Sequence, residues 1–217
     1  MSRFDVILFD LDGTLTDPKA GIINSYMNAL NKLGLIEDDK ECIADYLGAP
    51  LHEYFTLKHD LKDGILDKAI KLYREYYSET GLYENCLYDG IPQLLEILSG
   101  KEMKLFLVTV KPAVFAKEIL RHFGIDKYFL KVYGSDLSSF NKSKEELIQE
   151  VISEQDAEIS STVMIGDRSY DVTGAKFNSI SSIALTYGYG SVEELSSAAP
   201  DFLINSVGEL KEFLDQT

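Results

Sequence analysis

Cysteine and histidine are scarce in this sequence of 217 residues. The two cysteines, Cys42 and Cys86, are too few for a disulfide framework and do not have the spacing of metal ligands. The three histidines, His52, His59 and His122, share no ligand or triad spacing with one another or with the cysteines. We therefore expect neither a disulfide-stabilised protein nor a zinc site.

Long apolar runs are also missing. No stretch approaches the roughly 20 residues that a membrane-spanning helix needs. The first ten residues lack the long apolar core and the cleavage site of a secretory signal. With 45% hydrophobic and 11% aromatic residues, the chain can nevertheless bury a sizeable core. We expect a folded protein of the cytoplasm.

Positive charge is in short supply, because 36 acidic residues face 21 basic ones and give a net charge of −15. A chain of this charge repels nucleic-acid backbones and anionic membrane surfaces, so neither is expected as a partner. If the ligand is itself an anion, local cations must overcome the mean negative field. That requirement favours a bound metal ion and a few well-placed lysines.

The first part of the chain combines one strand with helices. Residues 6–9 are four apolar residues in a row, which predicts a buried strand. Asp17 and Pro18 are typical of a helix start, and this helix is expected to end near Leu33. From there to about Glu84 the patterns are helical. One apolar stripe comprises Ile65, Ala69, Leu72 and Tyr76, widened by Tyr73 and Tyr77.

Beyond Gly90, strands and helices alternate. Strands are expected at residues 105–110, 129–133, 162–166, 180–186 and 202–204, with helices between them that begin at Pro112, at Lys144 and after Gly166. Such alternation implies right-handed crossovers and a parallel sheet that is covered on both faces. The expected fold class is therefore α/β, with a Rossmann-like parallel sheet core and an inserted all-helical segment.

Polar residues stand where several of these strands end, namely Asp10, Asp12, Thr109 and Asp167. In open parallel sheets, ligands bind beyond the carboxyl ends of the strands. Each residue alone is more often part of a turn than of a catalytic site. Their joint occurrence at one rim predicts a site there.

The segment from Phe9 to Asp17, FDLDGTLTD, resembles the first motif of the haloacid dehalogenase-like (HAD) hydrolases, in the phosphoglycolate phosphatase-like branch with a helical cap. Thr109-Val110-Lys111 is similar to the second motif of that family, and Lys144 to the third. Gly166 to Asp171, GDRSYD, is similar to the fourth. The stretch from Gly174 to Gly190 also resembles this branch, so the resemblance extends along the whole chain.

The resemblance implies an Mg²⁺-dependent phosphatase. Asp10 would attack the phosphoryl group, and Asp12 would protonate the leaving oxygen and then take a proton from water. The metal ligands would be Asp10, the backbone carbonyl of Asp12, and Asp167, with Asp171 supporting the metal from behind. The alternation of a strand fits these roles, because Asp10 and Asp12 can face one site while Leu11 points into the core.

Two further residues would bind the phosphate of the substrate. Thr109 would donate its hydroxyl proton, and Lys144 would neutralise charge shared by Asp10 and the phosphate. Lys142 competes with Lys144 for this role, and Lys144 is preferred because an acidic and apolar helix start follows it. Lys111 is either a second anion contact or an exposed charge at a strand end. Val110 departs from the family pattern, in which a small polar residue is more usual.

The resemblance also implies two domains, a hydrolase core of residues 1–15 and 85–217 and a helical cap of residues 16–84. The cap would act as a lid that recognises the leaving group, and its Gly48–Leu51 segment resembles a loop that faces the site in relatives. The expected partner is a small phosphate ester, and the expected assembly is a monomer or a homodimer. Phosphoglycolate, a nucleoside monophosphate, a sugar phosphate and pyrophosphate all remain open as substrates.

Three alternatives share the fold. A phosphomutase of this type has a histidine soon after the first motif, but no histidine precedes His52 here. A haloacid dehalogenase would lack Asp12, because its ester forms at carbon and no phosphoryl leaving group needs a proton. A non-catalytic phosphate-binding regulatory protein would have lost Asp10, Asp12 or Asp167, and all three are present.

Overall fold

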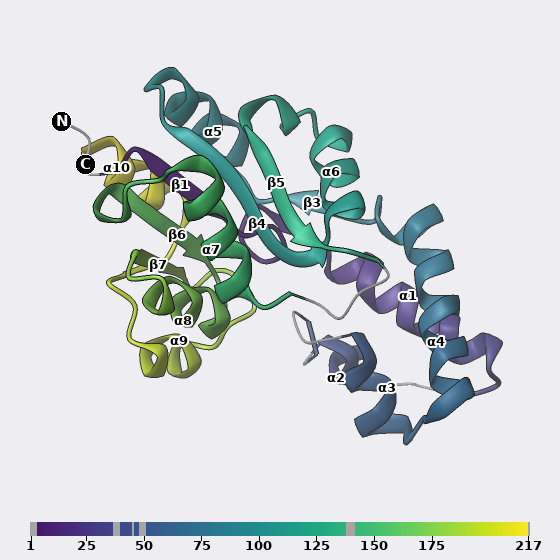
Figure 1. Ribbon diagram of the computed structural model, residues 1–217. Helices are drawn as coiled ribbons and strands as arrows, with labels where there is room; N and C mark the ends of the chain where they lie inside the picture. Colours follow the sequence, from purple (N-terminus) through teal and green to yellow (C-terminus); the bar gives the residue numbers. More distant parts are fainter. Residues whose placement is uncertain (1–3, 37–39, 45, 48–50, 138–141, 217) are drawn as a thin grey trace. The chain divides into compact units, whose positions relative to one another are not determined.

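The computed structural model describes residues 4–36, 40–44, 46–47, 51–137 and 142–216 (Figure 1). The chain divides into two compact units. The first, which we call the core unit, comprises Met1–Thr16 and Leu87–Thr217. The second, the helical unit, is Asp17–Cys86. A two-stranded sheet of β2 (Thr16–Asp17) and β3 (Cys86–Leu87) contains both points at which the chain passes from one unit to the other.

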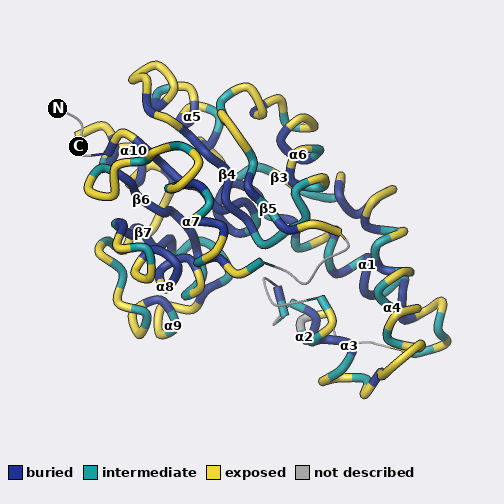
Figure 2. Tube along the Cα trace, in the orientation of Figure 1, coloured by how far each residue is buried: buried dark blue, intermediate teal, exposed yellow. Residues whose placement is uncertain are grey.

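The core unit is built on a parallel sheet of six strands in the order β5-β4-β1-β6-β7-β8. The strands are β1 (Val6–Phe9), β4 (Lys104–Pro112), β5 (Lys131–Ser135), β6 (Thr162–Gly166), β7 (Ser181–Leu185) and β8 (Phe202–Ile204). All four residues of β1 are buried, because this strand lies between β4 and β6. Figure 2 shows the same burial along the central strands. The predicted parallel α/β sheet is thus confirmed.

Helices cover both faces of this sheet (Figure 1). Parallel strands are joined by right-handed crossovers, so the direction in which the chain steps across the sheet decides the face of each helix. On one face lie α5 (Ile91–Gly100), α6 (Ala113–His122) and α10 (Val207–Gln216); on the other lie α7 (Lys144–Gln155), α8 (Ser169–Phe177) and α9 (Val192–Ala198).

The apolar core beneath α7 positions this helix on the sheet. Leu8 of β1 lies level with Phe106 of β4 and Met164 of β6, and all three belong to a buried cluster with Leu147 and Ile148 of α7. Burying each such side chain stabilises the fold by about 1.5–3 kcal/mol. This packing holds the first turn of α7 at the carboxyl ends of the strands.

The helical unit contains α1 (Lys19–Lys32), α2 (Lys40–Ala44), α3 (Leu51–His59), α4 (Asp63–Tyr76) and a π-helical turn, Tyr77–Gly81. Its core is aromatic: the ring of Tyr26 lies 4.7 Å from Tyr54, 5.0 Å from Phe55 and 4.7 Å from Tyr73. Tyr26 also donates a hydrogen bond of 3.1 Å to the carbonyl of Leu51. A buried hydroxyl is thereby satisfied within an apolar cluster.

The buried stripe of α4 agrees only in part with the predicted one. Ala69, Tyr73 and Tyr77 are buried, whereas Ile65, which was expected to begin the stripe, is 59% exposed. The three buried residues are four apart and therefore lie on one side of a helix. The packing of Tyr73 against Tyr26, together with the stacking of Tyr73 on Tyr77, selects this side.

Several element boundaries also differ from the predicted ones: β4 is Lys104–Pro112 rather than residues 105–110, and β7 is Ser181–Leu185 rather than residues 180–186. Strand β5 begins at Lys131 rather than at Phe129, because a 3₁₀ turn at Asp126–Tyr128 binds the Phe129 N–H to the Asp126 carbonyl. Helix α1 begins at Lys19, directly after the expected start at Asp17 and Pro18, and Asp17 accepts a hydrogen bond of 3.0 Å from the Lys19 N–H.

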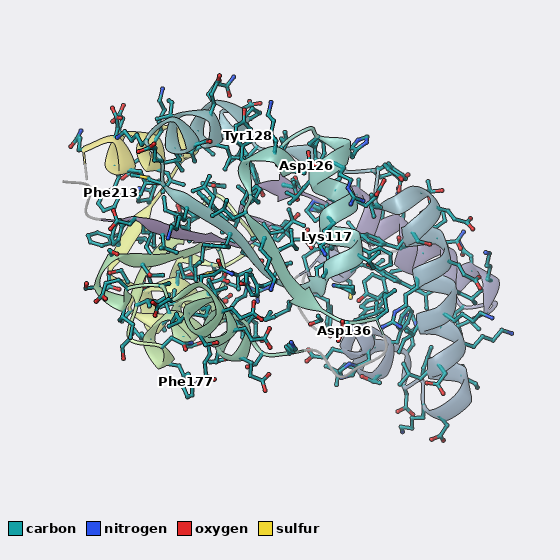
Figure 3. All side chains as sticks on the ribbon, turned by 45° about the horizontal axis from the view of Figure 1, so that its top comes forward. Lys117, Asp126, Tyr128, Asp136, Phe177 and Phe213 are labelled. Carbon is teal, nitrogen blue, oxygen red and sulfur yellow. The ribbon has the colours of Figure 1, made fainter. Side chains whose placement is uncertain are left out.

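Some large apolar side chains of the core unit are exposed. Phe177, the last residue of α8, is 70% exposed and points away from the sheet (Figure 3). Within the part of the chain that the structure describes, no helix is long and apolar enough to cross a membrane.

Candidate active site

The loop after β1 places two carboxylates at the rim of the sheet. The Asp10 N–H donates to the Ile165 carbonyl of β6 over 2.9 Å, which continues the ladder one residue past the strand. Leu11 then points inward and is fully buried, while its carbonyl accepts the N–H groups of Thr14, Leu15 and Thr16. A tight turn results, which holds Asp10 and Asp12 on the opposite side from Leu11.

Asp167, directly after β6, is enclosed by this loop and by the segment after β7. The Thr14 hydroxyl donates to Asp167 Oδ1 over 3.0 Å, and the Tyr189 N–H donates to Oδ2 over 2.8 Å. A Cβ atom on Gly13 would lie 2.1 Å from Asp167 Oδ2, and one on Gly188 would lie 2.3 Å from Asp167 Cβ. Glycine is therefore required at both positions for the backbone to approach this carboxylate.

Lys144, the first residue of α7, contacts two carboxylates and a backbone carbonyl of β4. Its Nζ lies 3.0 Å from Asp10 Oδ1 and 2.8 Å from Asp171 Oδ1, and it donates to the Val108 carbonyl over 2.9 Å. The side chain of Lys144 is 3% exposed. Burial alone would lower its pKa, but the charges of Asp10 and Asp171 outweigh burial and raise the pKa above its usual range. Lys144 therefore stays charged.

Lys142 lies elsewhere, although it is two residues away in the sequence. Its Nζ pairs with Glu150 Oε1 at 2.5 Å, and both side chains are more than a third exposed. Between the two lysines weighed from the sequence, the one that contacts Asp10 is thus Lys144.

Lys111 is neither exposed nor separate from the carboxylates. Its Nζ lies 2.5 Å from Asp12 Oδ2 and 2.7 Å from Asp12 Oδ1. Burial raises the pKa of Asp12, and the ammonium of Lys111 acts in the opposite direction without cancelling that rise. The sequence left the role of Lys111 open, since nothing near residue 111 indicates a partner at residue 12.

Thr109 is 2% exposed and lies near the end of β4, two residues before Lys111. Its hydroxyl oxygen accepts a hydrogen bond of 3.3 Å from the Lys111 N–H. A hydroxyl that accepts one hydrogen bond still carries a proton to donate. Thr109 therefore has the chemistry expected for a phosphate contact at this rim.

Three carboxylates converge closely enough to share a cation. One oxygen each from Asp10, Asp167 and Asp171 lies within 4.8 Å of the others. Hard carboxylate oxygens are the ligands that Mg²⁺ prefers. The carboxylates of Asp10, Asp12, Asp167 and Asp171 carry four formal negative charges against the two positive charges of Lys111 and Lys144, so a divalent cation would balance the six side chains.

The raised pKa of Asp167 also favours a cation beside these carboxylates. Burial, followed by repulsion from Asp10 and Asp171, raises the pKa of Asp167 to about 8. Such a carboxylate ionises readily when a cation lies beside it. The oxygens of Asp171 are already engaged, Oδ1 with Lys144 and Oδ2 with the Arg168 N–H at 3.1 Å. Asp171 thus supports Lys144 directly, a contact that the sequence did not predict.

The contacts that hold the segment from Gly166 to Asp171 in place were also not predictable from the sequence. Glu194 at the start of α9 accepts hydrogen bonds from the Ser169 N–H and hydroxyl, each of 2.8 Å, and from Arg168 Nε at 3.0 Å. Tyr187 donates to the Thr14 carbonyl over 2.9 Å. The stretch from Tyr187 to Gly190 is therefore part of the wall around Asp167.

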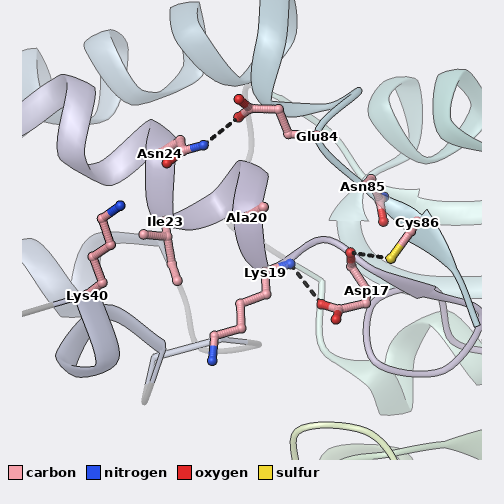
Figure 4. Close-up of a pocket in the computed structure, with 9 residues that line it drawn as sticks. All are labelled: Asp17, Lys19, Ala20, Ile23, Asn24, Lys40, Glu84, Asn85 and Cys86. Carbon is pink, nitrogen blue, oxygen red and sulfur yellow. Dashed lines mark hydrogen bonds between the residues drawn. The ribbon is translucent and has the colours of Figure 1, made fainter.

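The helical unit contains a hollow of about 660 Å³ (Figure 4). Lys19, Lys40 and Asn24 line it, together with Glu84, which accepts a hydrogen bond of 3.1 Å from Asn24. Leu51, at the start of α3, lies among the described residues, but the other three residues of the predicted Gly48–Leu51 segment lie outside them.

Comparison with known proteins identifies the family of this chain. The sequence pattern of the family described as haloacid dehalogenase-like hydrolase matches residues 7–185. A 5'-nucleotidase of Pseudomonas aeruginosa is 41% identical over 98% of this chain and 96% of its own length. The crystal structure of a putative phosphatase from Clostridium difficile superposes with a TM-score of 0.92 at 40% identity, covering 99% of this chain and 100% of that one.

Two further relatives carry different names. A phosphoglycolate phosphatase of Vibrio parahaemolyticus is 32% identical over 98% of this chain and 97% of its own length. The tyrosine-protein kinase PtkA of Mycobacterium tuberculosis is 33% identical over 96% of this chain and 72% of its own length. Family, fold and enzyme class agree with the predictions from the sequence: the chain belongs to the haloacid dehalogenase-like hydrolases and is a phosphoric monoester hydrolase.

Proposed function

We propose that this protein hydrolyses small phosphorylated metabolites in an Mg²⁺-dependent reaction that passes through a phosphoryl group on Asp10. The observation that carries the proposal is the contact of Asp10 Oδ1 with buried Lys144. An ammonium there lowers the cost of bringing an anionic phosphate to an anionic nucleophile. The same contact aligns the carboxylate for attack.

In the first step, an oxygen of Asp10 forms a bond to phosphorus while the bond from phosphorus to the leaving oxygen breaks. Asp12 gives its proton to that leaving oxygen, and its raised pKa favours a protonated fraction. Thr109 donates its hydroxyl proton to a phosphoryl oxygen. Splitting the reaction in this way replaces one difficult displacement with two easier ones.

In the second step, water attacks phosphorus, and the bond between phosphorus and Asp10 breaks. Asp12 accepts a proton from this water, and inorganic phosphate leaves. Asp10 and Asp167, with the Asp12 carbonyl, would hold the metal ion, which when bound supplies charge neutralisation for the transferred group. Asp171 keeps Lys144 in place throughout.

We further propose that the helical unit selects the leaving group. Lys19, Lys40 and Asn24 line its hollow, and the Asn24 side chain donates a hydrogen bond to Glu84 (Figure 4). Asp17 and Glu84 also line the hollow, so its charges balance and the lining suits a polar leaving group, as in phosphoglycolate or a nucleoside monophosphate. The names of the two relatives that are phosphoglycolate phosphatase and 5'-nucleotidase support these two substrate classes.

A substrate panel tests the selection. kcat/KM would be measured with Mg²⁺ for phosphoglycolate, nucleoside monophosphates, sugar phosphates, pyrophosphate and acetyl phosphate, in the wild type and in Lys40→Met. We expect the variant to change the ranking of the larger esters and to leave acetyl phosphate nearly unchanged, because its leaving group is small. A uniform loss on every substrate would contradict the proposal.

The same assay shows whether water or another hydroxyl receives the phosphoryl group. Hydrolysis releases one inorganic phosphate for each leaving group set free. Transfer of the phosphoryl group to a different acceptor, as in a kinase, sets the leaving group free without that phosphate, and a mutase releases neither. We expect equal amounts of the two products.

A further inference from the structure

Lys111 forms a close ion pair with Asp12 at the rim and has no role of its own in the proposed reaction. The two Nζ–Oδ distances are 2.5 and 2.7 Å, so one ammonium holds both oxygens of the carboxylate. The side chains are 9% and 19% exposed. Ion pairs that are this far from solvent add little net stability, because both charges lose hydration. A role in placing Asp12 explains the contact better than a role in folding.

The backbone beneath Lys111 is itself held in place. Its N–H donates to the buried Thr109 hydroxyl, and the pairing of β4 with β5 shifts register between Thr109 and Pro112. Irregularities of this kind redirect side chains at the ends of strands. The shift occurs where Lys111 leaves the ladder and its side chain meets Asp12.

The two lysines of the rim divide the carboxylates between them. Lys144 contacts Asp10 and Asp171, whereas Lys111 contacts Asp12. In the proposed reaction Asp10 carries the phosphoryl group and Asp12 moves the proton. Removing Lys111 should therefore disturb proton transfer and leave the nucleophile as it is.

We propose that Lys111 is a positioning residue that aims the ionised carboxylate of Asp12 at the water which attacks the phosphoryl group on Asp10. This proposal rests on the proposed function. The form of Asp12 that pairs with an ammonium is the carboxylate, and a carboxylate is what the second step needs. There the water oxygen bonds to phosphorus, its proton passes to Asp12, and the Asp10 carboxylate leaves with the bonding electrons.

Rapid-quench kinetics of Lys111→Met with p-nitrophenyl phosphate and Mg²⁺ test this role. The p-nitrophenolate leaving group needs no proton, so the first step should proceed at nearly the wild-type rate. The second step should slow by roughly 10-fold to 100-fold, because the base is misaligned. We expect a burst of about one p-nitrophenolate per enzyme, accumulation of phosphoprotein, and recovery of most turnover in Lys111→Arg. Lys142→Met is the matched control and should show wild-type kinetics.

A double variant separates positioning from a merely structural role. If Lys111 acts through Asp12, Asp12→Asn with Lys111→Met should be no slower than Asp12→Asn alone. Independent, multiplicative losses would overturn the proposal, as would a slow Lys111→Met enzyme without a burst or with equal losses in both steps. If Asp12→Asn itself forms and loses phosphoprotein at the wild-type rate, the proposed function fails. If Asp12→Asn slows the second step but Lys111→Met does not, the role of Lys111 fails alone.

Discussion

At the scale of single residues, Lys144 is the group whose removal should cost most among the cations. It is buried against two carboxylates, so Lys144→Met leaves Asp10 and Asp171 without a counter-charge and removes stabilisation of the transferred phosphate. We expect kcat/KM with p-nitrophenyl phosphate to fall by roughly 10²–10³-fold. Lys142→Met should stay within about twofold of wild type, because an exposed ion pair contributes little.

The comparison depends on both variants being folded. Breaking a buried pair destabilises a protein by about 3–5 kcal/mol, so urea unfolding should accompany the kinetics. Lys144→Arg, which keeps the charge, serves as a second variant if the methionine form unfolds. Equal losses in the variants at 142 and 144 would contradict the assignment of the phosphate site to Lys144.

At the scale of elements, Glu194 fastens α9 to the start of α8. Burial alone would raise the pKa of Glu194, but the Ser169 N–H and hydroxyl and the Arg168 guanidinium lower it below its usual range. A carboxyl whose pKa is lower in the folded state stabilises the fold above its ordinary pKa and loses this contribution as the pH falls through the folded value.

We therefore expect Glu194→Gln to lower the free energy of unfolding at neutral pH by about 1.5–3 kcal/mol, the range for hydrogen bonds to a charged group. The difference from wild type should shrink as the pH falls through the lowered pKa of the folded state, where the wild-type carboxyl also becomes neutral. Urea unfolding at several pH values measures it, with Glu193→Gln, an exposed neighbour on the same helix turn, as control. A difference that does not depend on pH would show that the charge of Glu194 is not what matters.

Elements were predictable from the sequence where local pattern decides them. The bounds of β1, β6 and β8 are as expected, because runs such as Thr162–Gly166 are apolar and end in a turn. The stripe of α4 was predicted only in part, because the ring contacts of Tyr73 decide which side of the helix is buried. The predicted start of β5 was wrong, because the hydrogen bond of the Phe129 N–H to Asp126 delays the strand. The contacts of Lys111 with Asp12 and of Glu194 with Ser169 join segments far apart in the sequence, so no periodicity could indicate them.

At the scale of the whole molecule, the protonation of a buried carboxyl links the stability of the fold to metal binding. The protein carries a net charge of −15, and in the absence of a cation the folded state holds a proton on Asp167 up to a pKa of about 8. Because that folded value is above the ordinary one, the contribution is complete below the ordinary pKa and is lost as the pH rises toward 8. A metal ion bound between the carboxylates would offset this loss.

Mg²⁺ should consequently raise the melting temperature, and more at about pH 8.5 than at about pH 6, because protons compete with the metal at Asp167. At a concentration 100 times its Kd, the ion would contribute about 2.7 kcal/mol. Differential scanning calorimetry with and without Mg²⁺ measures the shift. Asp167→Asn should lose both the shift and its pH dependence, and a larger shift at the lower pH would contradict the site.

The central claim is that Asp10 carries the phosphoryl group, and trapping that group tests it most directly. The protein with Mg²⁺ is mixed with p-nitrophenyl phosphate, quenched in acid within one turnover, digested, and examined by mass spectrometry. We predict one added phosphoryl group on the peptide that contains Asp10, released by hydroxylamine as an acyl phosphate is, and absent in Asp10→Asn. A wild-type rate in Asp10→Asn, or a phosphoryl group on a different residue, would contradict the account.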